Sequence, residues 1–295
     1  MSGSSSRDEL LSPEFLARLE RLDFRIRRLQ RGLQRGDVET IRTGSSTLFR
    51  EHRAYVAGDD PRFVDWNAFM RTGQLHVKKF QAEERPHIFI LLDGSASMGL
   101  HGGAKWRMAS RVAASLGGLA LMRHAVLSLR IFPGRQARTF SGRGAIPELL
   151  ASLASARPEG QADFVEATAS MLLRHRGVGM AFLLSDWMDT RNHAHALKRL
   201  RHMGFATRAI WIDDASDRNL QPDSSVALTD PETGHSIRIP MTRAIIDEYL
   251  RVLDLHEAAF ATLCRQLEIP LDRISASGDC EAAVLRVVQS STFGA

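Results

Sequence analysis

The sequence predicts an α/β fold in which helices cover a mostly parallel β-sheet. After Pro86, short apolar runs alternate with segments of helical length, and this alternation is the signature of such a sheet. At 295 residues the chain suits one enlarged domain or two modest ones, and 44% hydrophobic and 25% charged residues are typical of globular proteins. The composition therefore argues against a disordered chain and against a miniprotein built on disulfides.

The amino-terminal region is expected to contain a flexible tail over residues 1–11 and then a helix. Ser12 is a candidate N-cap, Pro13 suits the first helical position, and Glu14 places an acid in the first turn. Six apolar side chains then recur at spacings of three and four, on one stripe: Phe15, Leu19, Leu22, Ile26, Leu29 and Leu33. Five arginines lie off this stripe: Arg18, Arg21, Arg25, Arg28 and Arg35.

This basic helix has two interpretations. It could bind a partner, an acidic membrane surface or nucleic acid, or it could pack its apolar stripe on its own domain with the arginines in water. We favour packing, because Glu20 and Asp23 interrupt the basic residues and few aromatic residues accompany the arginines. The net charge of +5 is too mild to indicate a nucleic-acid binder by itself.

Residues 12–85 are assigned to this helix and to an elaborated segment ahead of the sheet. Residues 58–61 are a strong turn signal, and residues 74–80 are a plausible strand. Five residues are interpreted as a structural turn, with the tryptophan packed on the sheet, in preference to a ligand site: Asp59, Asp60, Asp65, Trp66 and Asn67.

The α/β domain itself is assigned to residues 86–292, with a hairpin insertion near 225–239. The expected strands of the sheet are residues 88–92, 126–132, 180–184, 205–212 and 271–275. The expected helices are residues 105–123, 163–174, 193–203, 243–267 and 280–289.

Two of the expected strands lead into carboxylates. Asp93 follows the first strand, with the hydroxyls of Ser95 and Ser97 at every second residue, and Asp186 follows the strand at 180–184. Ligands bind at the carboxyl ends of strands in open α/β sheets, and oxygen donors of this kind suit a hard divalent cation such as Mg²⁺. If the two strands are neighbours, a cation or a shared proton has to relieve the repulsion between the carboxylates. The competing interpretation is a loop whose serines only cap the following helix.

These residues resemble a known site. Asp93-x-Ser95-x-Ser97 with Asp186 resembles the metal-ion-dependent adhesion site of von Willebrand factor A domains. Three segments ahead of it resemble, more specifically, the domain-of-unknown-function 58 family: Gly-Asp-Asp-Pro-Arg-Phe-Val-Asp-Trp-Asn-Ala at 58–68, Arg-Thr-Gly at 71–73 and Val-Lys-Lys-Phe at 77–80. The resemblance covers residues 45–290 and implies a von Willebrand A-like (Rossmann-like) sheet with an amino-terminal helical and β extension.

The family resemblance also implies a function. It implies Mg²⁺, or Mn²⁺ or Ca²⁺, held by Asp93, Ser95, Ser97 and Asp186, with one position open for a carboxylate of a partner protein. The partner is expected to be a MoxR-type AAA+ ATPase or a client protein, and the role to be assembly or remodelling without enzymatic turnover. These adhesion sites also use a threonine, whose place is taken here by Ala162. Either Asp163 is the substitute ligand or water fills the position, whereas Thr168 lies too deep in the following helix.

Two alternative functions stay open: a metal-dependent phosphoester hydrolase, and a nucleic-acid binder acting through the arginine-rich helix. The sequence contains no phosphate-binding or dinucleotide-binding glycine motif and no Gly-x-Ser-x-Gly elbow. Cys264 and Cys280 do not form a disulfide framework, and no stretch is apolar for long enough to span a membrane. We therefore expect a cytoplasmic protein without a small-molecule substrate.

Overall fold

The computed structural model describes residues 9–33, 48–56, 64–81, 85–134, 136–174, 179–189, 193–232 and 234–290. The chain forms two compact units, one made of residues 1–31 with 86–295 and the other of residues 32–85. The predicted boundary before Pro86 is also where the chain returns from the smaller unit to the larger one. The amino-terminal helix, however, belongs to the larger unit and not to the segment with which the sequence grouped it.

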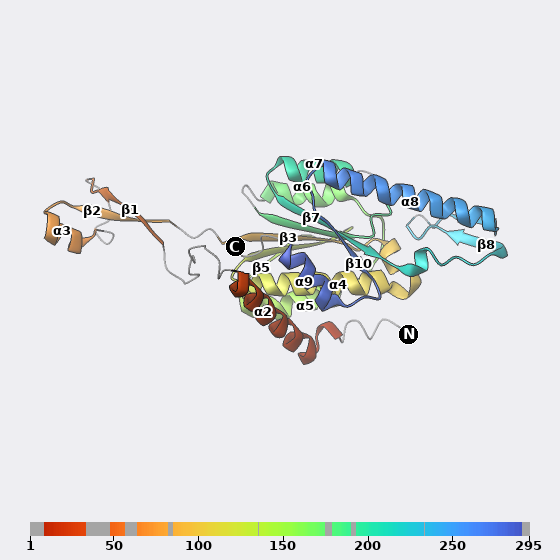
Figure 1. Ribbon diagram of the computed structural model, residues 1–295, viewed down its shortest axis with the longest axis horizontal. Helices are drawn as coiled ribbons and strands as arrows, with labels where there is room; N and C mark the ends of the chain where they lie inside the picture. The colour runs from red at the N-terminus through yellow and green to blue at the C-terminus, as the bar shows by residue number, and fades with distance from the viewer. Residues whose placement is uncertain are drawn as a thin grey trace. The chain divides into compact units, whose positions relative to one another are not determined.

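The larger unit is built on a six-stranded sheet in the order β10-β7-β6-β3-β4-β5 (Figure 1). Five strands are parallel: β3 (His87–Asp93), β4 (Val126–Phe132), β6 (Met180–Ser185), β7 (Ala206–Asp213) and β10 (Leu271–Ser275). The edge strand β5 (Arg138–Ser141) is antiparallel to β4. The expected α/β fold with a mostly parallel sheet is therefore confirmed.

Helices cover both faces of the sheet. They are α2 (Pro13–Leu33), α4 (Leu100–Met122), α5 (Ile146–Ala154), α6 (Phe164–Arg174), α7 (His193–His202), α8 (Arg243–Gln266) and α9 (Cys280–Gln289). Short 3₁₀ turns lie at η2 (Ala96–Gly99), η3 (Arg143–Ala145) and η4 (Ala215–Asp217). The sequence did not predict α5 or β5, because each is too short to establish a period.

Alternate side chains of β3 point into two separate apolar cores. Ile88, Ile90 and Leu92 join the core formed with α2, α4, α5 and α9. Phe89 and Leu91 join the opposite core, which is formed with α6, α7 and α8. Figure 1 shows these two sets of helices on opposite faces of the sheet. Burial on both faces explains why β3 is an unbroken apolar run in the sequence.

The amino-terminal helix packs its apolar stripe on its own domain, as favoured from the sequence. Phe15, Leu19, Leu22 and Ile26 are buried members of the first core. Four arginines of the opposite side are exposed: Arg18, Arg21, Arg25 and Arg28. The side chains of Leu29, Leu33 and Arg35 lie outside the described residues.

The start of this helix also follows the predicted chemistry. The Phe15 amide donates a hydrogen bond of 3.2 Å to Ser12 Oγ, which makes Ser12 the N-cap. The predicted flexible tail was drawn too long, because Leu10 is helical and only 1% exposed. Its apolar side chain gains more from the core than from water. Residues 1–8 of the predicted tail lie outside the described residues.

The smaller unit contains one antiparallel strand pair and one short helix. β1 (Leu48–Ala54) pairs with β2 (His76–Gln81), and α3 (Trp66–Thr72) lies between them in sequence. Asp65 caps α3 by accepting bonds from the amides of Asn67 and Ala68, both at 3.1 Å. Asp65 is therefore a structural capping residue, whereas Asp59 and Asp60 lie outside the described residues.

The expectation that Trp66 packs on the sheet was wrong. Trp66 is 56% exposed, and its ring meets Phe69 edge to face at 6.2 Å. Met70 is 79% exposed on the same short helix, whereas Ala68 is buried. A capping signal fixes where such a helix begins, but it does not determine which of its side chains are covered.

The hairpin insertion forms a separate two-stranded sheet within the larger unit. β8 (Asp223–Thr229) pairs with β9 (Ser236–Met241) in antiparallel register. Asp230 closes the turn, since its carbonyl accepts a bond from the Gly234 amide and its side chain accepts one from the Glu232 amide, both at 2.9 Å. In the part of the chain that the structure describes, no helix is both long and apolar enough to cross a membrane.

Candidate functional site

The candidate site lies at the carboxyl ends of β3 and β6. These strands are parallel neighbours with Leu92 opposite Leu184, so Asp93 and Ser185 follow on adjacent strands. α4, which follows β3, packs in one core, and α7, which follows β6, packs in the other. The chain therefore passes from β3 to one face of the sheet and from β6 to the other face. Open α/β sheets bind ligands at such a switch point.

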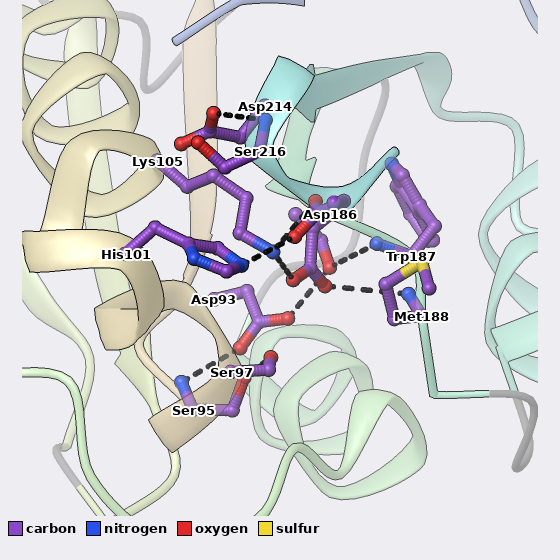
Figure 2. Close-up of polar contacts among 12 residues, drawn as sticks. Asp93, Ser95, Ser97, His101, Lys105, Asp186, Trp187, Met188, Asp214 and Ser216 are labelled. Atoms are coloured by element: carbon purple, nitrogen blue, oxygen red, sulfur yellow. Dashed lines mark hydrogen bonds and ion pairs between the residues drawn. The ribbon is translucent and has the colours of Figure 1, made fainter. Parts of the chain in front are cut away.

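The Asp93 carboxylate is fully enclosed and accepts two hydrogen bonds (Figure 2). Asp93 is 1% exposed, its Oδ1 accepts from the Ser95 amide at 2.8 Å, and its Oδ2 accepts from the Ser185 hydroxyl at 2.6 Å. The Ser185 hydroxyl in turn accepts from the Trp187 amide at 2.9 Å. Because that amide is a donor, the Ser185 proton is directed at Asp93.

The two predicted serine ligands lie together beside Asp93. Ser95 Oγ and Ser97 Oγ are 3.1 Å apart, Ser95 is buried and Ser97 is half-buried. The competing interpretation, in which the serines cap the following helix, is not what the structure has, because Ser95 makes no side-chain capping bond at η2. Both hydroxyl oxygens therefore remain available as ligands for a cation.

Backbone hydrogen bonds hold this loop in place. The Gly94 amide donates to the Phe132 carbonyl at 2.7 Å, and the Gly94 carbonyl accepts from the Glu159 amide at 2.7 Å. The Ala96 amide donates to the Gly160 carbonyl at 2.9 Å. The loop is thus fixed to the end of β4 and to the segment before α6, so its hydroxyls are positioned in advance.

Asp186 is paired with a lysine that the sequence analysis missed. Lys105 Nζ donates to Asp186 Oδ2 at 2.8 Å and to Asp217 Oδ2 at 3.2 Å (Figure 2). His101 Nε2 lies 3.2 Å from the other oxygen of Asp217, and the Met188 amide donates to Asp186 Oδ1 at 3.3 Å. The available signal was weak, because Lys105 is one of three basic residues, with Arg107 and Arg111, in the turns that follow the serine loop.

Burial and repulsion dominate the electrostatics of Asp93. Burial, and then the charge of Asp186, raise the pKa of Asp93 to about 7, although hydrogen bonds from Ser185 and Ser95 oppose this rise. Burial alone would lower the pKa of Lys105, but Asp186 and Asp217 outweigh it and raise that pKa above its ordinary value. The ammonium is therefore charged, and it neutralises only one of the three carboxylates.

The turn after β6 is held in a strained conformation. Trp187 has a φ of +54°, a value that residues other than glycine rarely adopt. Its indole Nε1 donates to the Ile210 carbonyl at 3.2 Å, and its own carbonyl lies 2.7 Å from His256 Nε2 of α8. The ring is fully buried and stacks on Phe164 at 4.9 Å. Such strain persists only where the surroundings enforce it, and here the buried contacts of Trp187 hold the turn that directly follows Asp186.

The structure brings together four of the five predicted ligands: Asp93, Ser95, Ser97 and Asp186. Asp163 is exposed and caps α6, because its Oδ1 accepts from the Glu166 amide at 2.9 Å. No hydrogen bond joins Asp163 to the other four within the described ranges, and its role as a ligand stays a prediction. Ala162 is buried in the second apolar core. Thr168 is buried too, and its hydroxyl donates to the Phe164 carbonyl at 2.8 Å, which agrees with its exclusion.

The donor set fits a hard divalent cation in chemistry and in charge. Its ligating atoms are carboxylate and hydroxyl oxygens, which Mg²⁺ and Ca²⁺ prefer. When Asp93, Asp186 and Asp217 are all ionised they outnumber the single ammonium of Lys105 by two, and without a cation the raised pKa of Asp93 leaves part of that carboxyl protonated near neutral pH. Among the described residues, no group of three or more His, Cys, Asp or Glu side chains could hold a metal ion. A cation here would therefore depend on the serine hydroxyls as well as on the aspartates.

The fold and this strand-end cluster define a mixed α/β protein with a mostly parallel sheet and an acidic site at its switch point. Residues 51–259 match the family model described as "Protein of unknown function DUF58", and the chain belongs to this family. The uncharacterized proteins Rv1480 of Mycobacterium tuberculosis and Mb1516 of Mycobacterium bovis are each 26% identical to it over 305 residues, covering 99% of this chain and 94% of theirs.

The solved structures that are similar to the chain include two from Bacteroides. They are the conserved hypothetical protein BatB from Bacteroides thetaiotaomicron, with a TM-score of 0.43 and 14% identity, and an aerotolerance-related membrane protein from Bacteroides fragilis, with a TM-score of 0.42 and 15% identity. Each match covers 69% of this chain and 97% of the other.

Proposed function

We propose that this chain is a von Willebrand A-like interaction protein that binds a divalent cation and uses it to hold a partner protein. The cation is Mg²⁺, or Mn²⁺ or Ca²⁺, and the ligands are Asp93, Ser95, Ser97 and Asp186. The proposed partner is a MoxR-type AAA+ ATPase, or a client protein that offers a carboxylate, in the cytoplasm. The family resemblance supports the partner, and the cluster at the end of β3 supports the cation.

A single observation carries the proposal: the buried Asp93 carboxylate lies beside a second buried carboxylate, and the pair has only one ammonium to balance it. Burying an unbalanced carboxylate is costly, and proteins normally neutralise it with a proton or a cation. The raised pKa of Asp93 expresses this cost. A divalent cation would remove it, because its positive charge would take the place of the proton on Asp93 and balance both carboxylates.

The accessibility of the cluster favours binding to a partner. Asp93, Ser95 and Asp186 are buried, whereas Ser97 is half-buried and marks the side from which solvent reaches the loop. A cation held by these groups would keep at least one position toward that side. An incompletely coordinated divalent ion strongly prefers an anionic oxygen, and a side-chain carboxylate on another protein supplies one.

The exposed residues of α3 are also consistent with a protein that binds other proteins. Trp66, Phe69 and Met70 are three large apolar side chains within five residues, all of them exposed. Contiguous exposed apolar groups are uncommon on surfaces that only face water, and they often mark interaction sites. The smaller unit by itself therefore presents an apolar surface that suits a protein partner.

Calorimetric titration tests the cation site. Mg²⁺, Mn²⁺ and Ca²⁺ are titrated separately into the wild type, into Asp93→Ala and into Asp247→Ala, which changes an exposed carboxylate of α8. We expect saturable heat with at least one ion in the wild type and in Asp247→Ala, and its loss in Asp93→Ala. Equal and negligible heats in all three proteins, with or without a MoxR-type ATPase, would refute the proposal.

Co-purification tests the role of the cation in partner binding. The chain is used to capture a MoxR-type ATPase with Mg²⁺ and again with EDTA. If EDTA and Asp93→Ala each abolish capture, the result supports the bridging role of the cation. Capture that neither changes would show that the ion does not hold the partner. Metal-dependent turnover of a generic phosphoester that is lost in Asp186→Ala would instead favour a hydrolase.

A further inference from the structure

We infer that Lys105 is a built-in cation that competes with the divalent ion for Asp186 and so sets the affinity of the site. This inference rests on the proposed cation site and adds a residue that nothing in the serine motif indicates. It makes cation binding an exchange at Asp186, in which an incoming ion replaces an ammonium that the fold already provides.

The position of Lys105 is the first step. Its side chain is 2% exposed, and the ammonium contacts two carboxylates that lie 81 and 112 residues further along the chain. Three residues with positive φ precede it at the start of α4, namely His101, Gly102 and Gly103. This irregular turn places the regular part of α4, and Lys105 with it, directly after the serine loop.

The two oxygens of Asp186 make the competition direct. Oδ2 accepts the bond from Lys105 at 2.8 Å, and Oδ1 accepts a weaker one from the Met188 amide at 3.3 Å. A divalent ion that draws on Asp186 therefore has to share this carboxylate with the ammonium or replace it. The ammonium and the ion would repel each other strongly, because both would lie against a carboxylate that is only 2% exposed.

Asp217 provides an alternative partner for the displaced ammonium. Lys105 already bonds Asp217 Oδ2 at 3.2 Å, so it can leave Asp186 without losing every countercharge. The next residue, Arg218, forms ion pairs with Asp254 at 2.8 Å and Glu257 at 2.7 Å on α8. Because α8 anchors η4 in this way, Asp217 stays within reach when the exchange occurs.

The inference predicts opposite effects for two substitutions. Lys105→Met removes the competitor, so we expect divalent ions to bind about tenfold more tightly or better. Asp217→Asn removes the alternative partner and leaves Lys105 with Asp186 alone, so we expect binding weaker by about threefold or more. Lys105→Arg keeps the charge and should resemble the wild type. Lys198→Met, at an exposed lysine of α7, is the matched control and should change nothing.

The experiment is a calorimetric titration of Mg²⁺ and Mn²⁺ into these five proteins, with circular dichroism and urea unfolding to establish that each is folded. Tighter binding to Lys105→Met than to the wild type supports the inference, as does binding that appears only in Lys105→Met. Equal or weaker binding to a folded Lys105→Met overturns it and leaves the cation site in place. Absence of heat in both proteins overturns the cation site as well. If Lys105→Met does not fold, Asp217→Asn decides, and an affinity equal to that of the wild type overturns the inference.

Discussion

The Ser185 hydroxyl donates a hydrogen bond of 2.6 Å to Asp93 Oδ2, which joins the last residue of β6 to the last residue of β3. The same hydroxyl accepts a bond from the Trp187 amide at 2.9 Å. One serine therefore positions the first aspartate of the site and also closes the strained turn that carries the second. Because all three residues are buried, each of these bonds forms where water cannot replace it.

Replacing Ser185 by alanine should destabilise the domain. The change leaves the Trp187 amide without its acceptor and removes one donor from a buried carboxylate, and each such loss costs about 1–3 kcal/mol. Urea unfolding of Ser185→Ala measures this cost. Ser110→Ala is the matched control, since Ser110 is equally buried and its hydroxyl has no hydrogen-bond partner among the described residues. A loss in Ser110→Ala as large as that in Ser185→Ala would contradict the role of these bonds.

Stability in the absence of divalent ions should fall as the pH rises. Asp93 has an ordinary pKa of 3.8 and a pKa of about 7 in the folded chain, so the folded state binds this proton more tightly than the unfolded state does. The free energy of unfolding should therefore decrease from about pH 4 through about pH 7, by as much as ~4 kcal/mol from this group, and level off by about pH 8.

Asp93→Asn isolates this effect. Asparagine cannot ionise, so Asp93→Asn should lack this loss of stability. The difference in unfolding free energy between the wild type and Asp93→Asn should therefore change with pH. Urea unfolding in EDTA from pH 4.5 to pH 8 measures it, with Asp247→Asn, at an exposed carboxylate of α8, as the control. Parallel pH profiles for the wild type and Asp93→Asn would show that Asp93 does not keep its proton in the folded chain.

A bound divalent ion should oppose this pH dependence. The ion and the proton compete for Asp93, so stabilisation by Mg²⁺ or Mn²⁺ should be small at pH 5 and larger at pH 8. At a hundred times the dissociation constant the gain is about 2.7 kcal/mol. Thermal unfolding with the ion, with EDTA and with NaCl at matched ionic strength measures it. A gain of the same size in Asp93→Asn would place the ion elsewhere.

The sequence predicts most of this site because each strand end can be recognised from residues that are neighbours in the chain. An apolar run that ends in a carboxylate identifies a strand end, and the parallel pairing of β3 with β6 then brings Asp93, Ser95, Ser97 and Asp186 together. Lys105 could not be assigned in this way. Its partners are remote in sequence, and whether its side chain reaches them depends on how α4 packs against the sheet.

The elements that the sequence missed have a similar physical reason. β5 has four residues and buries only Phe140, so no alternation is visible. Trp66 was misplaced because an aromatic residue next to a cap has the same local pattern whether it is covered or exposed. Packing between elements that are distant in sequence decided both cases, whereas caps, strand ends and the apolar stripe of α2 depend on neighbouring residues.

The contact between Leu19 of α2 and Gly118 of α4 should be a main source of stability for the amino-terminal helix. Leu19 is buried, and a β-carbon added to Gly118 would lie 2.4 Å from Leu19 Cδ2. Leu19→Ala should therefore cost about 2–5 kcal/mol of unfolding free energy. Arg21→Ala, on the exposed side of the same helix, should change it by no more than about 0.5 kcal/mol.

A double-mutant cycle makes this prediction specific. Gly118→Ala alone should cost about 1–3 kcal/mol, because its methyl group overlaps Leu19. Leu19→Ala opens space for that methyl group, so the double mutant should be more stable than the sum of the single losses allows, by about 0.5 kcal/mol or more. Urea unfolding of the four proteins measures the coupling. Strict additivity would mean that α2 does not lie on α4 in solution, and its apolar stripe would then be free to bind a partner or a membrane surface.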